Sequence, residues 1–131
     1  MRVQDAMNRD VLTVGPQHTL RDACRLMARR HVGAAVVVDP ETAGLGILTE
    51  RDVLEAIAAG EDPDVELVDA HLTKDLVFAA PEWLLDDAAM AMVKGNFRHL
   101  VVLDGYEVVG ILAMRDIVRS WTASSGAARI G

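Results

Sequence analysis

Gly46-Ile47-Leu48-Thr49-Glu50-Arg51-Asp52 is repeated sixty-four residues later as Gly110-Ile111-Leu112-Ala113-Met114-Arg115-Asp116. Five of the seven positions are identical in the two copies. Each copy predicts the end of a buried strand followed by the start of a helix, whose free N–H groups and dipole favour an aspartate in the first turn. The copies differ chemically at their fourth position, because Thr49 carries a hydroxyl and Ala113 does not.

The composition predicts one compact domain or two small fused repeats with an aliphatic core. Of the 131 residues, 51% are apolar but only 4% are aromatic. No apolar run approaches the roughly 20 residues of a membrane span, and the polar opening residues do not resemble a signal sequence. The single cysteine, Cys24, excludes an internal disulfide, so we expect a cytoplasmic protein. The net charge of −7 disfavours a nucleic-acid partner, since binding phosphates requires Lys and Arg.

Hydrophobic periodicity predicts a regular series of elements in the first half of the chain. Thr19 is a suitable N-cap with Asp22 three residues later, so a helix is expected to begin there. The continuous apolar run at 32–38 predicts a strand buried on both faces. The expected elements are a helical turn at 3–7, an extended segment at 11–14, a helix at 19–31, strands at 32–38 and 45–48, and a helix at 50–59.

The second half of the chain repeats this series, which indicates an internal duplication. We place the first repeat at residues 1–60, an acidic linker at 61–66, the second repeat at 67–121 and a flexible tail at 122–131. In this alignment residues 67–71 match residues 3–7 at a spacing of sixty-four. We expect the repeats to share one hydrophobic core, so that neither repeat folds alone.

The duplicated pattern resembles the cystathionine-β-synthase (CBS) domain, two copies of which form a CBS pair, or Bateman module. The motifs that carry the resemblance are Asp5-Ala6-Met7, Thr13–Pro16, Thr19–Ala23, the valine strand ending at Asp39, both copies of the glycine-to-aspartate motif, and Phe97–Asp104. The resemblance covers residues 1–121 and implies an α/β fold. It also implies small sheets packed with helices, with the tandem repeats related by a pseudo-two-fold axis. CBS pairs commonly dimerise, so we expect a homodimer.

In this family the cleft between the repeats binds AMP, ADP, ATP or adenosyl compounds, which implies a nucleotide site in this chain. A carboxylate such as Asp52 or Asp116 is a good acceptor for two ribose hydroxyls, and the Thr49 hydroxyl at a helix start suits a phosphate. Arg98 and His99 match basic residues that reach ligand phosphates in family members, whereas the first repeat has Gly33-Ala34 there. The nucleotide-binding residues that the resemblance implies are Thr13, Val14, Ala35, Thr49, Arg51, Asp52, Phe78, Ala79, Arg98, His99, Leu100, Arg115 and Asp116.

The base of such a ligand needs a flat apolar slot. The candidates for this slot are Thr13, Val14 and Ala35 in the first site, and Phe78, Ala79 and Leu100 in the second. Since Ala113 offers no hydroxyl, we expect the Thr49 site to bind nucleotide more tightly, with Arg98 and His99 opposing this order or reaching across the dyad.

Each candidate also has a purely structural interpretation. Asp52 and Asp116 would complement helix N-termini without any ligand, and Thr49 would serve as an N-cap alone. Arg98 and His99 would be surface residues at the entrance of a strand. Arg21, Arg25 and Arg29, four residues apart, would form a solvated helix face, with an anion or dimer contact as the sharper alternative.

Other functional classes receive little support from the sequence. The histidines are His18, His31, His71 and His99, and they lack the spacing of a metal site. We expect no metal, no catalytic residues, and no cofactor other than an adenine nucleotide as regulatory ligand. The hypothesis is therefore a regulatory module, not an enzyme, that signals to an unknown protein target by a change in shape or assembly. The alternative is a ligand-free dimerisation or scaffold module.

Overall fold

A computed structural model describes residues 1–130, with side chains as far as Ala123, and it divides into two compact units. One unit is the continuous segment Leu12–Leu76. The other, which we call the discontinuous unit, joins Met1–Val11 to the chain from Val77 onward. The spatial units therefore differ from the sequence repeats, because each unit takes its short leading segment from the other repeat.

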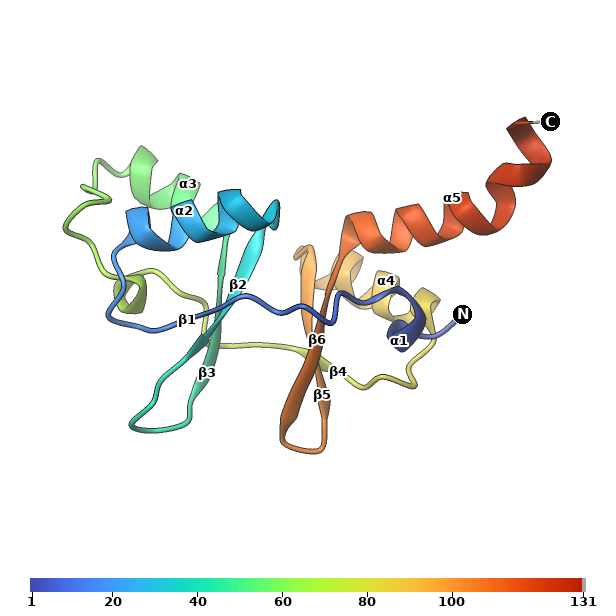
Figure 1. Ribbon diagram of the computed structural model, residues 1–131, viewed down its shortest axis with the longest axis horizontal. Coiled ribbons are helices and arrows are strands. Elements are labelled where there is room, and N and C mark those ends of the chain that lie inside the picture. Colours follow the sequence, from blue (N-terminus) through green and yellow to red (C-terminus); the bar gives the residue numbers. More distant parts are fainter. Residues whose placement is uncertain (131) are drawn as a thin grey trace. The chain divides into compact units, whose positions relative to one another are not determined.

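The Leu12–Leu76 unit contains a three-stranded sheet in the order β1-β2-β3 (Figure 1). Its elements are β1 (Thr13–Val14), α2 (Leu20–Arg30), β2 (Ala34–Val38), β3 (Leu45–Thr49), α3 (Glu50–Ala58) and the 3-10 turn η1 (Val68–Ala70). Strand β1 runs parallel to β2, and β2 runs antiparallel to β3 with Ala34 opposite Thr49. The predicted helices and strands of the first repeat are thus confirmed to within a few residues.

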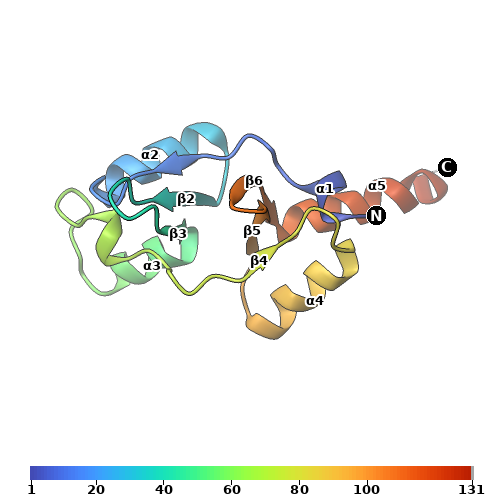
Figure 2. The same ribbon diagram turned by 90° about the horizontal axis from the view of Figure 1, so that it is seen from below.

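The discontinuous unit repeats this topology in a second sheet, β4-β5-β6 (Figure 2). Its elements are α1 (Val3–Ala6), β4 (Phe78–Ala79), α4 (Leu85–Gly95), β5 (His99–Asp104), β6 (Glu107–Ala113) and α5 (Met114–Ile130). Strand β4 is parallel to β5, and β5 is antiparallel to β6 with His99 opposite Ala113. The α/β class and the duplicated order of elements are confirmed.

Local chemistry explains the limits of helix α2. Thr19 accepts a hydrogen bond from Asp22 N at 3.1 Å, which satisfies one of the free donors of the first turn. The helix ends at His31, whose left-handed backbone has φ of 56°. Asn96 ends α4 in the same conformation, also with φ of 56°.

The acidic segment 61–66 also stabilises the start of α2. The carbonyl of Glu66 accepts from Leu20 N at 2.9 Å, and the carbonyl of Pro63 accepts from Arg21 N at 3.0 Å. The Arg21 guanidinium pairs with Asp64, and this hydrogen-bonded carboxylate raises the pKa of Arg21. Arg21, one of the three arginines of the predicted stripe, therefore already forms an ion pair within the chain.

Most of the buried apolar side chains of the described residues belong to two core clusters, one in each unit, and the expected sharing of one core by the two repeats stays a prediction. Sheet residues contribute to both from alternate positions, as the two-residue period of a strand requires. In the Leu12–Leu76 unit, Ala35 and Val37 of β2 pack with the apolar face of α2 and with Ala56 of α3. Ala34 and Val36 are buried as well, which confirms the predicted burial of β2 on both faces.

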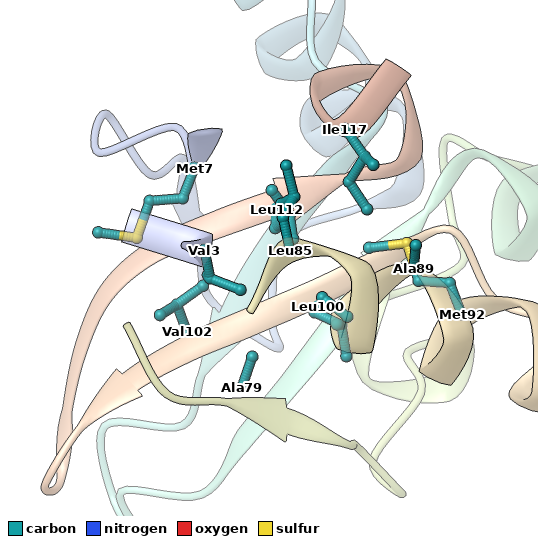
Figure 3. Packing of buried hydrophobic residues seen from close by; sticks show 11 residues of the cluster. Val3, Met7, Ala79, Leu85, Ala89, Met92, Leu100, Val102, Leu112 and Ile117 are labelled. Carbon is teal, nitrogen blue, oxygen red and sulfur yellow. The ribbon is translucent and has the colours of Figure 1, made fainter. Parts of the chain in front are cut away.

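Each core is completed by a leading segment that belongs to the other repeat. Val3 and Met7 join the cluster of the discontinuous unit beside Val102 and Leu112 (Figure 3). Val68 of η1 is fully buried in the cluster of the Leu12–Leu76 unit. Neither repeat, taken as the sequence delimits it, contains all the apolar residues that its sheet and helices bury.

The leading segments correspond at a spacing of sixty-five, one more than the sequence alignment uses. Val3 N donates to the carbonyl of Trp83 at 2.9 Å, and Val68 N donates to the carbonyl of His18 at 2.8 Å. The sequence match of residues 67–71 with residues 3–7 is therefore displaced by one residue. The sequence alignment matched Asp5-Ala6 with Asp69-Ala70, whereas the burial of Val3 and Val68 determines the register.

The predicted tail at 122–131 is partly helical. Helix α5 continues to Ile130, and Gly131 lies outside the described residues. The flexibility of this tail stays a prediction.

We expect residues 1–60 alone to remain unfolded or to associate, whereas the fragment 12–76 folds cooperatively. The first fragment lacks Val68 and leaves Val3 and Met7 without their core, while the second contains the whole of one cluster. Circular dichroism during urea unfolding, at several protein concentrations, distinguishes the two. A cooperative monomeric transition for 1–60 together with none for 12–76 would contradict the exchange of leading segments.

Candidate functional site

The first copy of the motif forms a reciprocal cap at the start of α3. Thr49 N donates to Asp52 Oδ2 at 2.9 Å, and Asp52 N donates to Thr49 Oγ1 at 3.3 Å. The Thr49 hydroxyl also lies 3.1 Å from Asp52 Oδ2 and donates to it. Both side chains are partly buried. The capping role expected for Thr49 and Asp52 is confirmed.

A second hydroxyl, from Thr73, reaches the Asp52 carboxylate. Thr73 Oγ1 donates to Asp52 Oδ1 at 3.2 Å. Thr73 is held there by two backbone hydrogen bonds with Ile47, of 2.9 and 2.8 Å. Gly46 permits this approach, because a Cβ at that position would lie 3.0 Å from the carbonyl oxygen of Thr73 and would collide with Leu72.

Sequence reasoning missed Thr73. The residue lies twenty-one positions after Asp52, in a segment without strand or helix periodicity. The sequence feature that could have pointed to Thr73 is its equivalence to Asn8 at a spacing of sixty-five. The alignment at a spacing of sixty-four did not pair these two residues.

The second copy of the motif surrounds Asp116 differently. Ala113 N donates to Asp116 Oδ2 at 2.9 Å, which reproduces the backbone part of the cap. In place of a threonine hydroxyl, the guanidinium of Arg119 lies 3.7 Å from Asp116 Oδ1. Asn8 exchanges backbone hydrogen bonds with Ile111, of 2.9 and 3.0 Å. Its side-chain oxygen, however, accepts from Asp10 N at 2.9 Å.

Both aspartates can act as caps and still accept hydrogen bonds from a ligand. A carboxylate offers about four lone-pair sites, and one or two of these serve the helix start. Asp52 receives hydroxyl donors from Thr49 and Thr73, and hydroxyls can rotate towards a ligand. Asp116 faces a cation instead. The two sites therefore share a carboxylate but not its surroundings.

The residues predicted for the adenine slots divide into two groups. Four of them are core residues with less than 3% exposure: Val14, Ala35, Ala79 and Leu100. Their side chains fill the hydrophobic clusters, so only their backbone atoms are available to a base. Thr13 is exposed and Phe78 is partly buried, and the side chain of neither belongs to a cluster. Their part in binding stays a prediction.

Two of the predicted basic residues, Arg98 and His99, lie next to the second motif. The carbonyl of Arg98 accepts from Met114 N at 2.8 Å, and His99 pairs with Ala113 across the β5–β6 ladder. Arg98 is exposed and His99 partly buried. Arg51 and Arg115 are exposed in the first turns of α3 and α5. The second motif thus has Arg98 beside it, where the first repeat has Gly33.

A separate pocket of about 300 Å³ lies in the Leu12–Leu76 unit. Its lining consists of Gly15, Pro16, Gln17, His18, Asp39, Pro40, Glu41 and Asp69. None of the predicted nucleotide residues borders it, and its charged side chains are acidic. This pocket does not suit a phosphate.

Among the side chains that the structure describes, no group of three His, Cys, Asp or Glu residues is arranged to hold a metal ion. The helices of the described chain also lack the combination of length and apolar character that crossing a bilayer requires. Cys24 lies partly buried on α2, and burial raises the pKa of its thiol, which disfavours the reactive thiolate.

Comparison with known families identifies both repeats. The profile described as "CBS domain" matches residues 3–59 and again residues 67–122. This chain belongs to the CBS domain family. Proteins built on CBS pairs are regulatory modules, and the recognition made from the sequence is confirmed.

Curated relatives share about a third of their residues with this CBS pair. The CBS domain-containing protein YhcV of Bacillus subtilis is 35% identical over 116 residues, which are 88% of this chain and 81% of YhcV. The protein MJ1225 of Methanocaldococcus jannaschii is 31% identical over 117 residues, which are 89% of this chain but only 41% of MJ1225. The chain thus corresponds to less than half of MJ1225.

Solved CBS structures share the fold. A protein with CBS domains from Burkholderia ambifaria has a TM-score of 0.88 at 28% identity, and the match covers 94% of this chain and 95% of that protein. A hexameric CBS-CP12 protein from bloom-forming cyanobacteria has a TM-score of 0.86 at 27% identity, covering 95% and 74%. The CBS pair of protein MJ0100, in complex with 5′-methylthioadenosine and S-adenosyl-L-methionine, has a TM-score of 0.85 at 23% identity, covering 95% and 98%.

Replacing Asp52 by alanine should destabilise this CBS pair more than replacing Asp116. Asp52→Ala leaves Thr49 N and the Thr73 hydroxyl without their acceptor, at a cost of about 1–2 kcal/mol. Asp116→Ala removes one backbone acceptor and a weak ion pair, for about 0.5–1 kcal/mol.

Urea unfolding of the two variants measures this difference, and Asp104→Ala at an exposed strand end is the control. Equal losses for Asp52→Ala and Asp116→Ala would show that the hydroxyls around Asp52 contribute nothing.

Proposed function

We propose that this CBS pair is a regulatory sensor of an adenine nucleotide or adenosyl compound, and that it signals by a change in shape or assembly. One observation carries the proposal. Each repeat presents a partly buried aspartate at a helix start, Asp52 or Asp116, held in place by backbone N–H groups. A fixed carboxylate is suited to accept from two adjacent ribose hydroxyls.

The surroundings of these aspartates support an adenosine-type ligand. Thr49 and Thr73 add hydroxyls near Asp52, and Arg98 adds a fork-shaped cation beside the second motif. The structural neighbour MJ0100 was crystallised with two adenosine compounds, although at 23% identity it shows the shared fold alone.

A ligand-free scaffold is the second candidate, and one observation favours it. Thr49 and Asp52 satisfy each other's hydrogen bonds without any ligand. In such a scaffold, the capping side chains at the helix starts would stabilise the fold and would bind no ligand.

A panel of nucleotides separates the sensor from the scaffold. We expect one adenine compound to raise the melting temperature, because a ligand at a hundred times its Kd stabilises the folded state by about 2.7 kcal/mol. The panel contains adenosine, 5′-methylthioadenosine, AMP, ADP, ATP and S-adenosylmethionine, with GTP as the control. The double variant Asp52→Asn and Asp116→Asn retains a capping side chain but loses the charge, and should lose the shift. If none of these compounds raises the melting temperature, the result supports the ligand-free scaffold.

We also propose that the chain forms a homodimer through the final helix of each repeat. Leu54 and Ile57 on α3 are 68% and 48% exposed. The equivalent residues on α5, Val118 and Trp121, are 48% and 43% exposed. Both repeats therefore keep an exposed apolar pair at the same two positions, three residues apart. The hexameric assembly of the CBS-CP12 neighbour shows that a protein of this fold can associate.

Light scattering should give a mass of twice the 14.2 kDa chain at micromolar concentration. Leu54→Glu places a charge in the apolar pair and should shift the mass towards the monomer. Val65→Glu is the matched control, because Val65 is 69% exposed in the 61–66 segment and outside both helices. A monomeric wild type, or equal effects of the two substitutions, would count against this interface.

A further inference from the structure

The same backbone hydrogen bond in both repeats places two side chains next to each other at the start of the final helix. Glu50 N donates to the carbonyl of Gly33 at 3.0 Å, and Met114 N donates to the carbonyl of Arg98 at 2.8 Å. Residue 50 therefore lies beside residue 33, and residue 114 lies beside residue 98. The backbone fixes this arrangement, whatever rotamer each side chain adopts.

The charges at these paired positions are opposite in the two repeats. The first repeat has a carboxylate and no cation, Glu50 beside Gly33, whereas the second has a cation and no carboxylate, Arg98 beside Met114. The Glu50 side chain also fills the space in which a side chain at position 33 would begin. A Cβ on Gly33 would lie 3.0 Å from Glu50 Cδ and would collide with Oε1. The first repeat thus has an acid where the second has an arginine.

A second pair of equivalent positions, residues 55 and 119, also has an acid in the first repeat and an arginine in the second. Arg119 lies on α5 three residues after Asp116 and 3.7 Å from its Oδ1. Glu55 occupies the corresponding position on α3, three residues after Asp52, so its charge repels that carboxylate instead of offsetting it. The arginine and aspartate of the motif itself are common to both repeats, so they do not contribute to the difference.

These charges affect ligands that share an adenosine but differ at the 5′ position. A ribose held by Asp52 would direct its 5′ substituent towards the residues that flank the helix start, Thr49 and Glu50. A 5′-phosphate carries up to two negative charges and would face Glu50 there without a neighbouring Arg98. A thioether at that position is uncharged, and a sulfonium is cationic, so neither is repelled.

We propose that Glu50 is a specificity-determining residue that makes the first motif select adenosine derivatives without a 5′-phosphate, whereas Arg98 makes the second motif select phosphorylated ones. This inference rests on the proposed function and names the ligand class of each of its two sites. It reverses, for phosphorylated ligands, the order of affinities expected from the Thr49 hydroxyl alone.

Calorimetry with AMP and 5′-methylthioadenosine tests the inference at one site at a time. In an Asp116→Asn background, which disables the second motif, the protein should bind 5′-methylthioadenosine more tightly than AMP. Adding Glu50→Met, the residue of the second repeat, should raise the AMP affinity about tenfold, or about 1.4 kcal/mol, and leave the thioether affinity within about twofold. A gain of affinity cannot result from unfolding. Glu41→Gln removes an exposed charge from the same unit and is the control for net charge.

The reciprocal variant gives the second repeat the two residues that the first repeat has at the paired positions. In an Asp52→Asn background, Arg98→Gly with Met114→Glu should lower the AMP affinity at least about tenfold while binding of 5′-methylthioadenosine is retained. Retained thioether binding shows that the variant is folded.

The outcomes separate this inference from the proposed function. If adenosine compounds bind but Glu50→Met leaves the ratio of AMP to thioether affinity unchanged, the role of Glu50 is refuted and the sensor function stands. If the wild type binds neither AMP nor 5′-methylthioadenosine but does bind another adenine compound, the inference fails and the sensor function stands. If it binds no adenine compound at all, both the function and the inference fail.

Discussion

Two short backbone bridges hold the leading segments against the third strand of each sheet, and much of the structure depends on them. Ile47 pairs with Thr73, and Asn8 pairs with Ile111, each through two hydrogen bonds. The approach is close enough that the strand must present a glycine, and Gly46 and Gly110 occupy that position. The glycine that opens each motif is therefore a packing requirement, which explains why both copies keep it.

The same constraint connects the fold to the candidate sites. The bridge from Ile47 brings the Thr73 hydroxyl to the Asp52 carboxylate, so one side of that site is supplied by a segment outside the motif. In the other unit the bridge delivers Asn8, whose side chain is engaged with its own turn, and Asp116 pairs with Arg119 instead. A duplicated backbone has thus produced two carboxylates in similar geometry but with different electrostatic surroundings.

Local physical rules made part of this structure predictable. The Thr19 cap, the helix that follows it and the strand at 32–38 depend on neighbours within a few residues, and the sequence displays those neighbours directly. The capping pair of Thr49 and Asp52 was visible for the same reason.

Features that depend on distant pairing were not predictable in this way. The exchange of leading segments, the register of sixty-five and the contact of Thr73 with Asp52 are set by tertiary packing, which leaves no period in the chain. The sequence alignment matched the two Asp-Ala pairs instead of the two buried valines, Val3 and Val68. The sequence alignment already matched Gly33 with Arg98 and Glu50 with Met114. It did not show that residue 50 lies beside residue 33, or residue 114 beside residue 98, and only the backbone hydrogen bonds reveal this.

The discontinuous unit has a consequence for the order in which the chain can fold during synthesis. Val3 and Met7 leave the ribosome about a hundred residues before their packing partners Leu112 and Ile117. The Leu12–Leu76 unit can be complete well before that, because all its core residues are contiguous in the chain. At about 5–20 residues per second, the first apolar side chains wait several seconds for their core. During this interval the segment that carries Val3 and Met7 stays accessible to proteases and chaperones, although the Leu12–Leu76 unit that follows it can already be folded.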